Sequence, residues 1–80
     1  MERILIVEKL KIIISSILKV DNLMMNDTIS AKDVEGWDSL SHMVIITEVE
    51  KFFKIQFKLK ELNKLTNMGN LISLIELKLN

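Results

Sequence analysis

The sequence predicts an all-α fold: a small four-helix bundle with a long loop between the first two helices and a short third helix. The 80 residues include no proline and only two glycines, a composition that favours helices over folds with many turns. Hydrophobic residues make up 49% of the chain, enough for the dense core that a short chain needs. Many of them recur at helical spacing. We expect a single domain spanning residues 1–80.

The first helix is expected over residues 2–18. Its apolar positions with helical spacing are Ile6, Leu10, Ile13, Ile14 and Ile17. Residues 20–37 lose this periodicity and are rich in Asp, Asn, Ser and Gly, which favour turns. We therefore expect a long loop with short helical turns in it, and a connection of this length is often functional. Its predicted anchors in the core are Leu23, Met24 and Ile29.

The second helix is expected to begin at Asp38-Ser39, because both residues are good N-caps and Gly36 can supply the turn before them. It runs to about Phe53. The stripe that should face the core is His42, Ile45, Ile46, Val49 and Phe53. A second stripe consists of Leu40, Met43, Val44 and Thr47. A domain this small cannot easily cover both faces of one helix, so the second stripe is a candidate contact surface. The alternative is that another helix covers it.

Two shorter pieces complete the expected fold. Residues 59–65 are rich in lysine and predict one or two helical turns. The last helix should begin near Thr66-Asn67, either of which can cap it, with Gly69 in its first turn. Its apolar positions with core spacing are Met68, Leu71, Ile72, Leu74, Ile75 and Leu79.

The residue types that carry enzyme chemistry are scarce in this chain. There is no cysteine for a disulfide, a thiolate metal site or a nucleophile, and one histidine argues against a His-carboxylate metal site. His42 lies one turn after Ser39, but it falls on the core stripe, and we interpret it as a structural histidine rather than a base. No Gly-rich phosphate loop is present. We expect no catalytic residue, no bound metal and no enzyme activity.

Nucleic acids and membranes are not expected partners. The lysines of residues 51–64 come without a recognition-helix signature or an overall basic excess, so we interpret them as a solvated face. The longest charge-free stretch, residues 65–75, has eleven residues, whereas a membrane-spanning helix needs about twenty. The N-terminal segment lacks the unbroken apolar region and the cleavage site of a signal peptide. We expect a cytoplasmic protein without membrane insertion.

The formal net charge of zero conceals a segregation of charge along the chain. The sum is +2 over residues 1–20, −6 over residues 21–50 and +4 over residues 51–80. Such a distribution can steer oppositely charged partners to one surface. The alternative is that acids and bases from different segments become neighbours in the folded protein.

The most informative motif is Gly36-Trp37-Asp38-Ser39-Leu40. A serine at the start of a helix has an accessible hydroxyl, and the helix dipole with its free N–H groups favours a phosphate attached there. The alternative is that Asp38 or Ser39 only caps the helix. The motif resembles that of the acyl carrier protein family, small four-helix carriers modified with 4′-phosphopantetheine on the serine of an Asp-Ser-Leu motif. The resemblance extends over nearly the whole chain, to the start of the last helix at residues 65–71.

The resemblance implies a mechanism in which a separate enzyme modifies the carrier. A phosphopantetheinyl transferase (holo-carrier synthase) would use the Ser39 hydroxyl to attack the pyrophosphate of coenzyme A, and Asp38 would take part in the complex with that transferase. The thiol of the attached arm would then carry acyl groups as thioesters, while the carrier itself catalyses nothing. Acyl-loading and acyl-transferring enzymes are the other implied partners of a monomeric carrier. Their implied docking residues are Leu40, Met43, Val44, Thr47 and Glu48.

The chain departs from the family pattern in its charge. Carriers of fatty acid synthesis are usually strongly acidic along the motif helix, whereas this helix has Ser41, His42, Val44 and Lys51 among such positions. Docking is therefore expected to depend more on apolar contact. The departure favours a dedicated carrier of a specialised pathway, such as polyketide, peptide or surface-polysaccharide assembly. An aminoacyl or peptidyl carrier shares the same fold and serine, and an unmodified helical protein-interaction domain is the remaining alternative.

Overall fold

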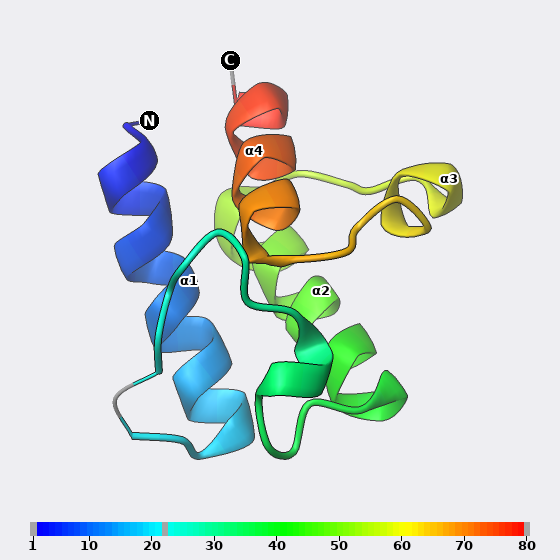
Figure 1. The fold of residues 1–80 in the computed structure, drawn as a ribbon. Helices are drawn as coiled ribbons and strands as arrows, with labels where there is room; N and C mark the ends of the chain where they lie inside the picture. The colour runs from blue at the N-terminus through cyan, green and yellow to red at the C-terminus, as the bar shows by residue number, and fades with distance from the viewer. Residues whose placement is uncertain (1, 22, 80) are drawn as a thin grey trace.

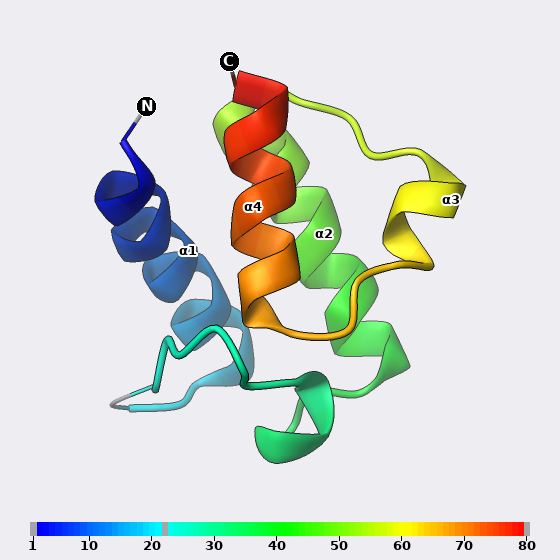
Figure 2. The same ribbon diagram turned by 45° about the horizontal axis from the view of Figure 1, so that its top comes forward.

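The computed structural model describes residues 2–21 and 23–79, and within these ranges all regular structure is helical. The α-helices are α1 (Arg3–Leu18), α2 (Ser39–Phe53), α3 (Leu59–Leu62) and α4 (Met68–Leu79), and a 3₁₀ turn, η1 (Ala31–Asp33), lies between α1 and α2. Figures 1 and 2 show that α1 begins at the end of the molecule where α2 and α4 finish. The predicted all-α class with four helices and a short third helix is confirmed.

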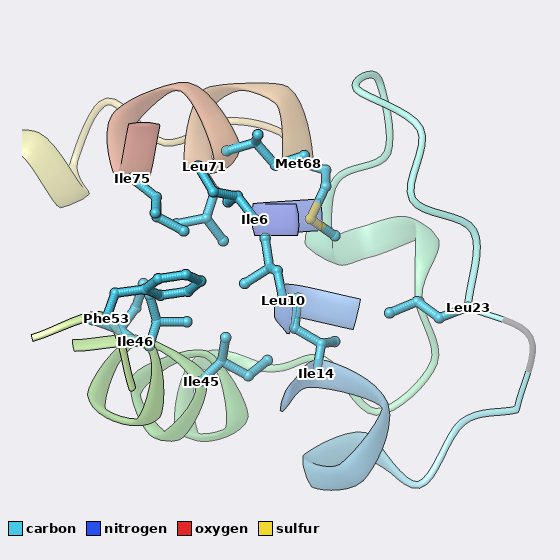
Figure 3. Close-up of a cluster of buried hydrophobic side chains, with 12 residues drawn as sticks. Ile6, Leu10, Ile14, Leu23, Ile45, Ile46, Phe53, Met68, Leu71 and Ile75 are labelled. Atoms are coloured by element: carbon cyan, nitrogen blue, oxygen red, sulfur yellow. The ribbon is translucent and has the colours of Figure 1, made fainter. Parts of the chain in front are cut away.

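The core is formed by one face of each long helix. Helix α1 packs against both α2 and α4. Figure 3 shows side chains of α2, such as Phe53 and Ile46, directed toward Leu71 and Ile75 of α4. The buried cluster comprises Ile6, Leu10, Ile14, Leu23, Ile45, Ile46, Val49, Phe53, Met68, Leu71, Ile72 and Ile75. Removing these side chains from water is the main source of stability for such a fold.

The boundaries of the first two helices agree with the prediction. Helices α1 and α2 lie within one residue of the predicted starts and ends. Each ends in a lysine with left-handed backbone, Lys19 at φ 55° and Lys54 at φ 57°, a position that glycine usually occupies. On the core stripe of α2, the aliphatic and aromatic residues are buried as predicted. His42 on the same stripe is only half-buried.

The third helix is shorter than predicted, because it stops at Leu62 and not at Leu65. After Leu62, the N–H of Lys64 donates to the carbonyl of Glu61 at 3.2 Å, and the N–H of Leu65 donates to the carbonyl of Leu62 at 3.2 Å. These bonds close tighter turns than the α-helix does. Helix α4 begins at Met68, one residue after the predicted cap Asn67, whose side-chain oxygen accepts from the N–H of Asn70 at 2.9 Å.

The connection between α1 and α2 is anchored differently from the prediction. Leu23 is buried, with 5% exposure, and Ile29 is half-buried, but Met24 is 60% exposed, so its predicted role as a core anchor is wrong. The connection is also anchored by backbone hydrogen bonds to the first turn of α4. The N–H of Met68 donates to the carbonyl of Ile29 at 2.7 Å, and the N–H of Gly69 donates to that of Asp27 at 2.9 Å. These bonds satisfy helix-terminal donors that have no partner within the helix.

Candidate functional site

Ser39 is the first residue of α2, and it is not the residue that caps the helix. Asp38 occupies the N-cap position with extended backbone, and its Oδ1 accepts a hydrogen bond from the N–H of Ser41 at 2.8 Å. Ser39 is exposed, and its hydroxyl makes no hydrogen bond to any residue that the structure describes. The predicted N-cap function therefore belongs to Asp38, and the Ser39 hydroxyl has no structural task in this part of the chain.

The N-terminal end of α2 itself favours an anion attached at Ser39. Beyond the cap, the first turn of α2 contains no acidic side chain. The first N–H groups of a helix have no intrahelical partner, and the dipole places partial positive charge there. The hydrogen bond from the backbone N–H of Ser41 is the main cause that holds the pKa of Asp38 below its ordinary value.

A tight turn leads into the site and is tied to α2. Gly36 has φ 85°, a left-handed conformation that favours glycine. Its carbonyl accepts a hydrogen bond from the Ser41 hydroxyl at 2.9 Å. The indole Nε1–H of Trp37 donates to Nδ1 of His42 at 3.1 Å, and the two rings are stacked with centroids 6.2 Å apart. His42 thus faces Trp37 and makes no hydrogen bond to Ser39 among the described residues, which supports its interpretation as a structural histidine.

Sequence reasoning did not connect Trp37 with His42. The signal was available, because an aromatic residue just before an N-cap and a histidine in the next turn lie close in space once the helix begins at residue 39. A hollow beside the two rings is also lined by Leu65, Met68 and Leu71, which come from segments far away in the sequence. That part of the site could not be derived from local patterns.

The second stripe of α2 lies on the surface, as predicted. Leu40 is 77% exposed, Met43 52% and Val44 42%. The Thr47 hydroxyl donates to the carbonyl of Met43 at 2.8 Å, so the polar atom of Thr47 is satisfied within its own helix. A shallow hollow is lined by Leu40, Met43, Val44, Thr47 and Glu48. The alternative that another helix covers this stripe is wrong for the part of the chain that the structure describes.

The charge segregation is partly retained in the folded protein. Asp33, Glu35 and Asp38 are exposed in the segment that leads to Ser39, whereas Lys51 and Lys54 are exposed at the opposite end of α2. Other charges pair across segments. Arg3 lies 3.5 Å from the carboxylate of Asp27 and 3.2 Å from that of Glu76, and Lys78 lies 2.9 Å from that of Glu61. The surface around Ser39 is therefore acidic through the connection and not through α2.

Over residues 2–21 and 23–79, no cluster of three or more His, Asp or Glu side chains could bind a metal ion. In those same ranges, no helix combines the length and the apolar character needed to cross a bilayer.

Comparisons with known proteins agree with this geometry. The family described as "Phosphopantetheine attachment site" matches residues 8–75. No curated protein sequence gives a significant match. Among solved structures, the chain is similar to a holo acyl carrier protein from Geobacter metallireducens, determined in solution by NMR. The TM-score is 0.86 and the identity 40%, over 91% of this chain and 84% of that one.

The fold and the matched region define a carrier domain built around a phosphopantetheine attachment site. This chain belongs to the acyl carrier protein family. Proteins of this family are carriers and not catalysts, and their cofactor is covalently attached 4′-phosphopantetheine.

The half-buried histidine predicts a pH dependence of stability. Burial lowers the pKa of His42 below its ordinary value of 6.5. The unfolded chain then binds a proton more readily than the folded one, so the free energy of unfolding should fall as the pH drops from about 6.5 toward the folded-state pKa. Above pH 6.5 this group should contribute no pH dependence. Urea midpoints measured between pH 5 and pH 8 would show the effect.

The matched control for this prediction is His42→Asn, which cannot titrate. The variant should lose the pH dependence between pH 5 and pH 6.5 but keep the dependence at lower pH, where lowered carboxyl pKa values act. Those carboxyls are Asp33, Asp38 and Glu61. His42 is the only histidine of the chain, so its imidazole proton signal gives the folded-state pKa directly. A folded-state pKa at or above 6.5 would contradict the prediction.

Proposed function

We propose that Ser39 is the residue to which 4′-phosphopantetheine is attached, and that the modified chain carries acyl groups as thioesters. The observation that carries the proposal is the division of roles at the start of α2. Asp38 caps the helix, whereas the hydroxyl of Ser39 is exposed and makes no hydrogen bond to the residues that the structure describes. Ser39 also lies inside the matched region, residues 8–75. The attached arm supplies a terminal thiol, a group that the chain lacks because it contains no cysteine.

The attachment step needs only the hydroxyl from this chain. The Ser39 oxygen forms a bond to the phosphorus of coenzyme A that bears the pantetheine, and the bond from that phosphorus to the nucleotide part breaks. The hydroxyl proton passes to the phosphopantetheinyl transferase, and the nucleotide leaves with the other phosphate. The product is a phosphodiester whose negative charge lies at the positive end of the α2 dipole.

Asp38 has two roles in this proposal. Its Oδ1 caps α2 through the N–H of Ser41, which keeps the carboxylate at a defined position beside Ser39. The same hydrogen bond holds the pKa of this carboxyl below its ordinary value, so its charge persists into more acidic solution than that of an ordinary aspartate. A fixed, exposed carboxylate next to the reacting hydroxyl is suited to contact the transferase, as the family resemblance implies.

The exposed stripe of α2 is the proposed docking surface. It begins directly after Ser39 and consists of Leu40, Met43, Val44, Thr47 and Glu48. Exposed apolar side chains adjacent to the modified residue would bring a partner's active site within reach of the arm. We propose that the transferase and then the acyl-loading and acyl-transferring enzymes contact this surface in turn. The pathway is fatty acid, polyketide or another specialised biosynthesis, and the carrier acts as a monomer.

The test is intact mass after incubation with coenzyme A, magnesium and a broad-specificity phosphopantetheinyl transferase. The wild-type chain should gain the mass of one phosphopantetheine, and Ser39→Ala should gain nothing. Ser16→Ala is the matched control, because Ser16 is also exposed and lies on α1; this variant should be modified like the wild type. If several transferases leave the wild type unchanged, the proposal fails. If Ser39→Ala is modified, the arm is attached elsewhere.

A further inference from the structure

The side chain of Trp37 adds a hydrogen bond between α2 and the turn before Ser39, beyond those that Ser41 makes at the start of the helix. Two ties are ordinary parts of the cap: Ser41 donates its N–H to Asp38 and its hydroxyl to the carbonyl of Gly36. A third tie reaches further into the helix, where the Trp37 indole N–H donates to Nδ1 of His42 at 3.1 Å. Because Trp37 lies two residues before Ser39, this bond restricts the direction from which the chain enters the site.

We propose that Trp37 and His42 are positioning residues for the modification of Ser39. Their hydrogen bond, called here the Trp37–His42 pair, keeps the turn at residues 36–38 against α2 and so keeps Ser39 in the arrangement that the transferase binds. The inference rests on the proposed function, since it concerns how Ser39 is presented.

The surroundings of the pair protect its hydrogen bond from competition by water. Both residues are half-buried, and the hollow that they line contains no charged side chain. The carboxylate of Asp38, the N-cap residue four positions before His42, accepts a hydrogen bond from Ser41. Partial exclusion of water strengthens a hydrogen bond and leaves fewer competing partners.

The geometry also defines the chemical requirement. Nδ1 of His42 accepts the hydrogen bond, so the imidazole is neutral with its proton on Nε2. Asparagine places an acceptor oxygen the same number of bonds from the backbone as Nδ1, whereas leucine has similar bulk and no acceptor. His42→Asn should therefore keep the tie, and His42→Leu should lose it. Trp37→Phe keeps an aromatic ring and removes the donor.

The test is the steady-state kinetics of modification with these variants as substrates of the transferase. Loss of one hydrogen bond should reduce the fraction of molecules with Ser39 correctly presented, so KM for the carrier should rise about three- to tenfold with kcat unchanged. Trp37→Phe and His42→Leu should show this rise, and their double variant should show no more than either one. His42→Asn should stay near the wild-type value.

Two further readouts separate positioning from general stability. Trp37 is the only tryptophan, so its indole N–H gives one NMR signal, which should be protected in the wild type and His42→Asn and lose protection in His42→Leu. Thermal midpoints show whether each variant is folded at the assay temperature. Unchanged KM in a folded His42→Leu that has lost indole protection would overturn the inference. So would a KM rise in His42→Asn equal to that in His42→Leu. A wild type that is not modified removes the proposed function and this inference with it.

Discussion

Replacement of Ile46 by alanine is expected to lower the free energy of unfolding by about 2–5 kcal/mol. Ile46 is 2% exposed and belongs to the buried cluster shared by the long helices (Figure 3). Two contributions add up in this loss: the free energy gained by burying the removed carbons, and the cost of the cavity that remains. Small domains are stable by only about 5–15 kcal/mol, so this single change should remove a large part of the stability. Urea denaturation measured by circular dichroism gives the value.

The matched control for Ile46→Ala is Leu40→Ala on the same helix. Leu40 is 77% exposed, so its truncation should change the stability by no more than about 0.5 kcal/mol. It should instead slow modification by the transferase, because Leu40 belongs to the proposed docking surface. Met43→Ala should behave in the same way. A large drop in the denaturation midpoint of Leu40→Ala, or a midpoint of Ile46→Ala equal to the wild type, would reverse the assignment of the two faces.

Replacement of Gly69 by valine is expected to cost about 2–4 kcal/mol and to detach the connection from α4. A Cβ at Gly69 would lie 2.9 Å from Cβ of Asp27 and 3.1 Å from its carbonyl oxygen. Relief of this overlap requires the connection to move, which breaks the bonds from the N–H groups of Met68 and Gly69 to Ile29 and Asp27. Urea denaturation gives the loss of stability, and hydrogen exchange of those two amides shows the local opening.

Gly36→Ala provides the comparison for Gly69→Val, because the two glycines are required for different reasons. Gly36 has φ 85°, and apart from its two chain neighbours no described residue has an atom within 4 Å of a Cβ added there. Its substitution should cost only the backbone strain of about 1–2 kcal/mol and leave the Met68 and Gly69 amides protected. Full stability and protection in Gly69→Val would show that the connection does not pack on α4 as closely as described.

The candidate site was largely predictable because its parts are close in the sequence. Asp38 and Ser39 lie at a helix start that is defined by a turn-forming Gly36, an N-cap residue and an apolar repeat, all within one or two turns. The exposure of Leu40 and Met43 was the expectation that chain length favoured, since 80 residues cannot easily cover both faces of α2, and the structure confirms it. Local dihedral preferences and helix periodicity act at this range.

The anchors of the connection were not predictable for the opposite reason. Met24 and Leu23 are adjacent apolar residues of the same segment, yet one is exposed and the other buried. The difference depends on where the connection crosses α4, and that is decided by hydrogen bonds between residues about forty positions apart, Asp27 and Ile29 with Gly69 and Met68. The sequence by itself determined the long helices, their buried stripes and the position of Ser39, because those depend on neighbours along the chain. Only the tertiary structure decided the course of the connection and the hollow beside Trp37 and His42, because those depend on contacts between distant segments.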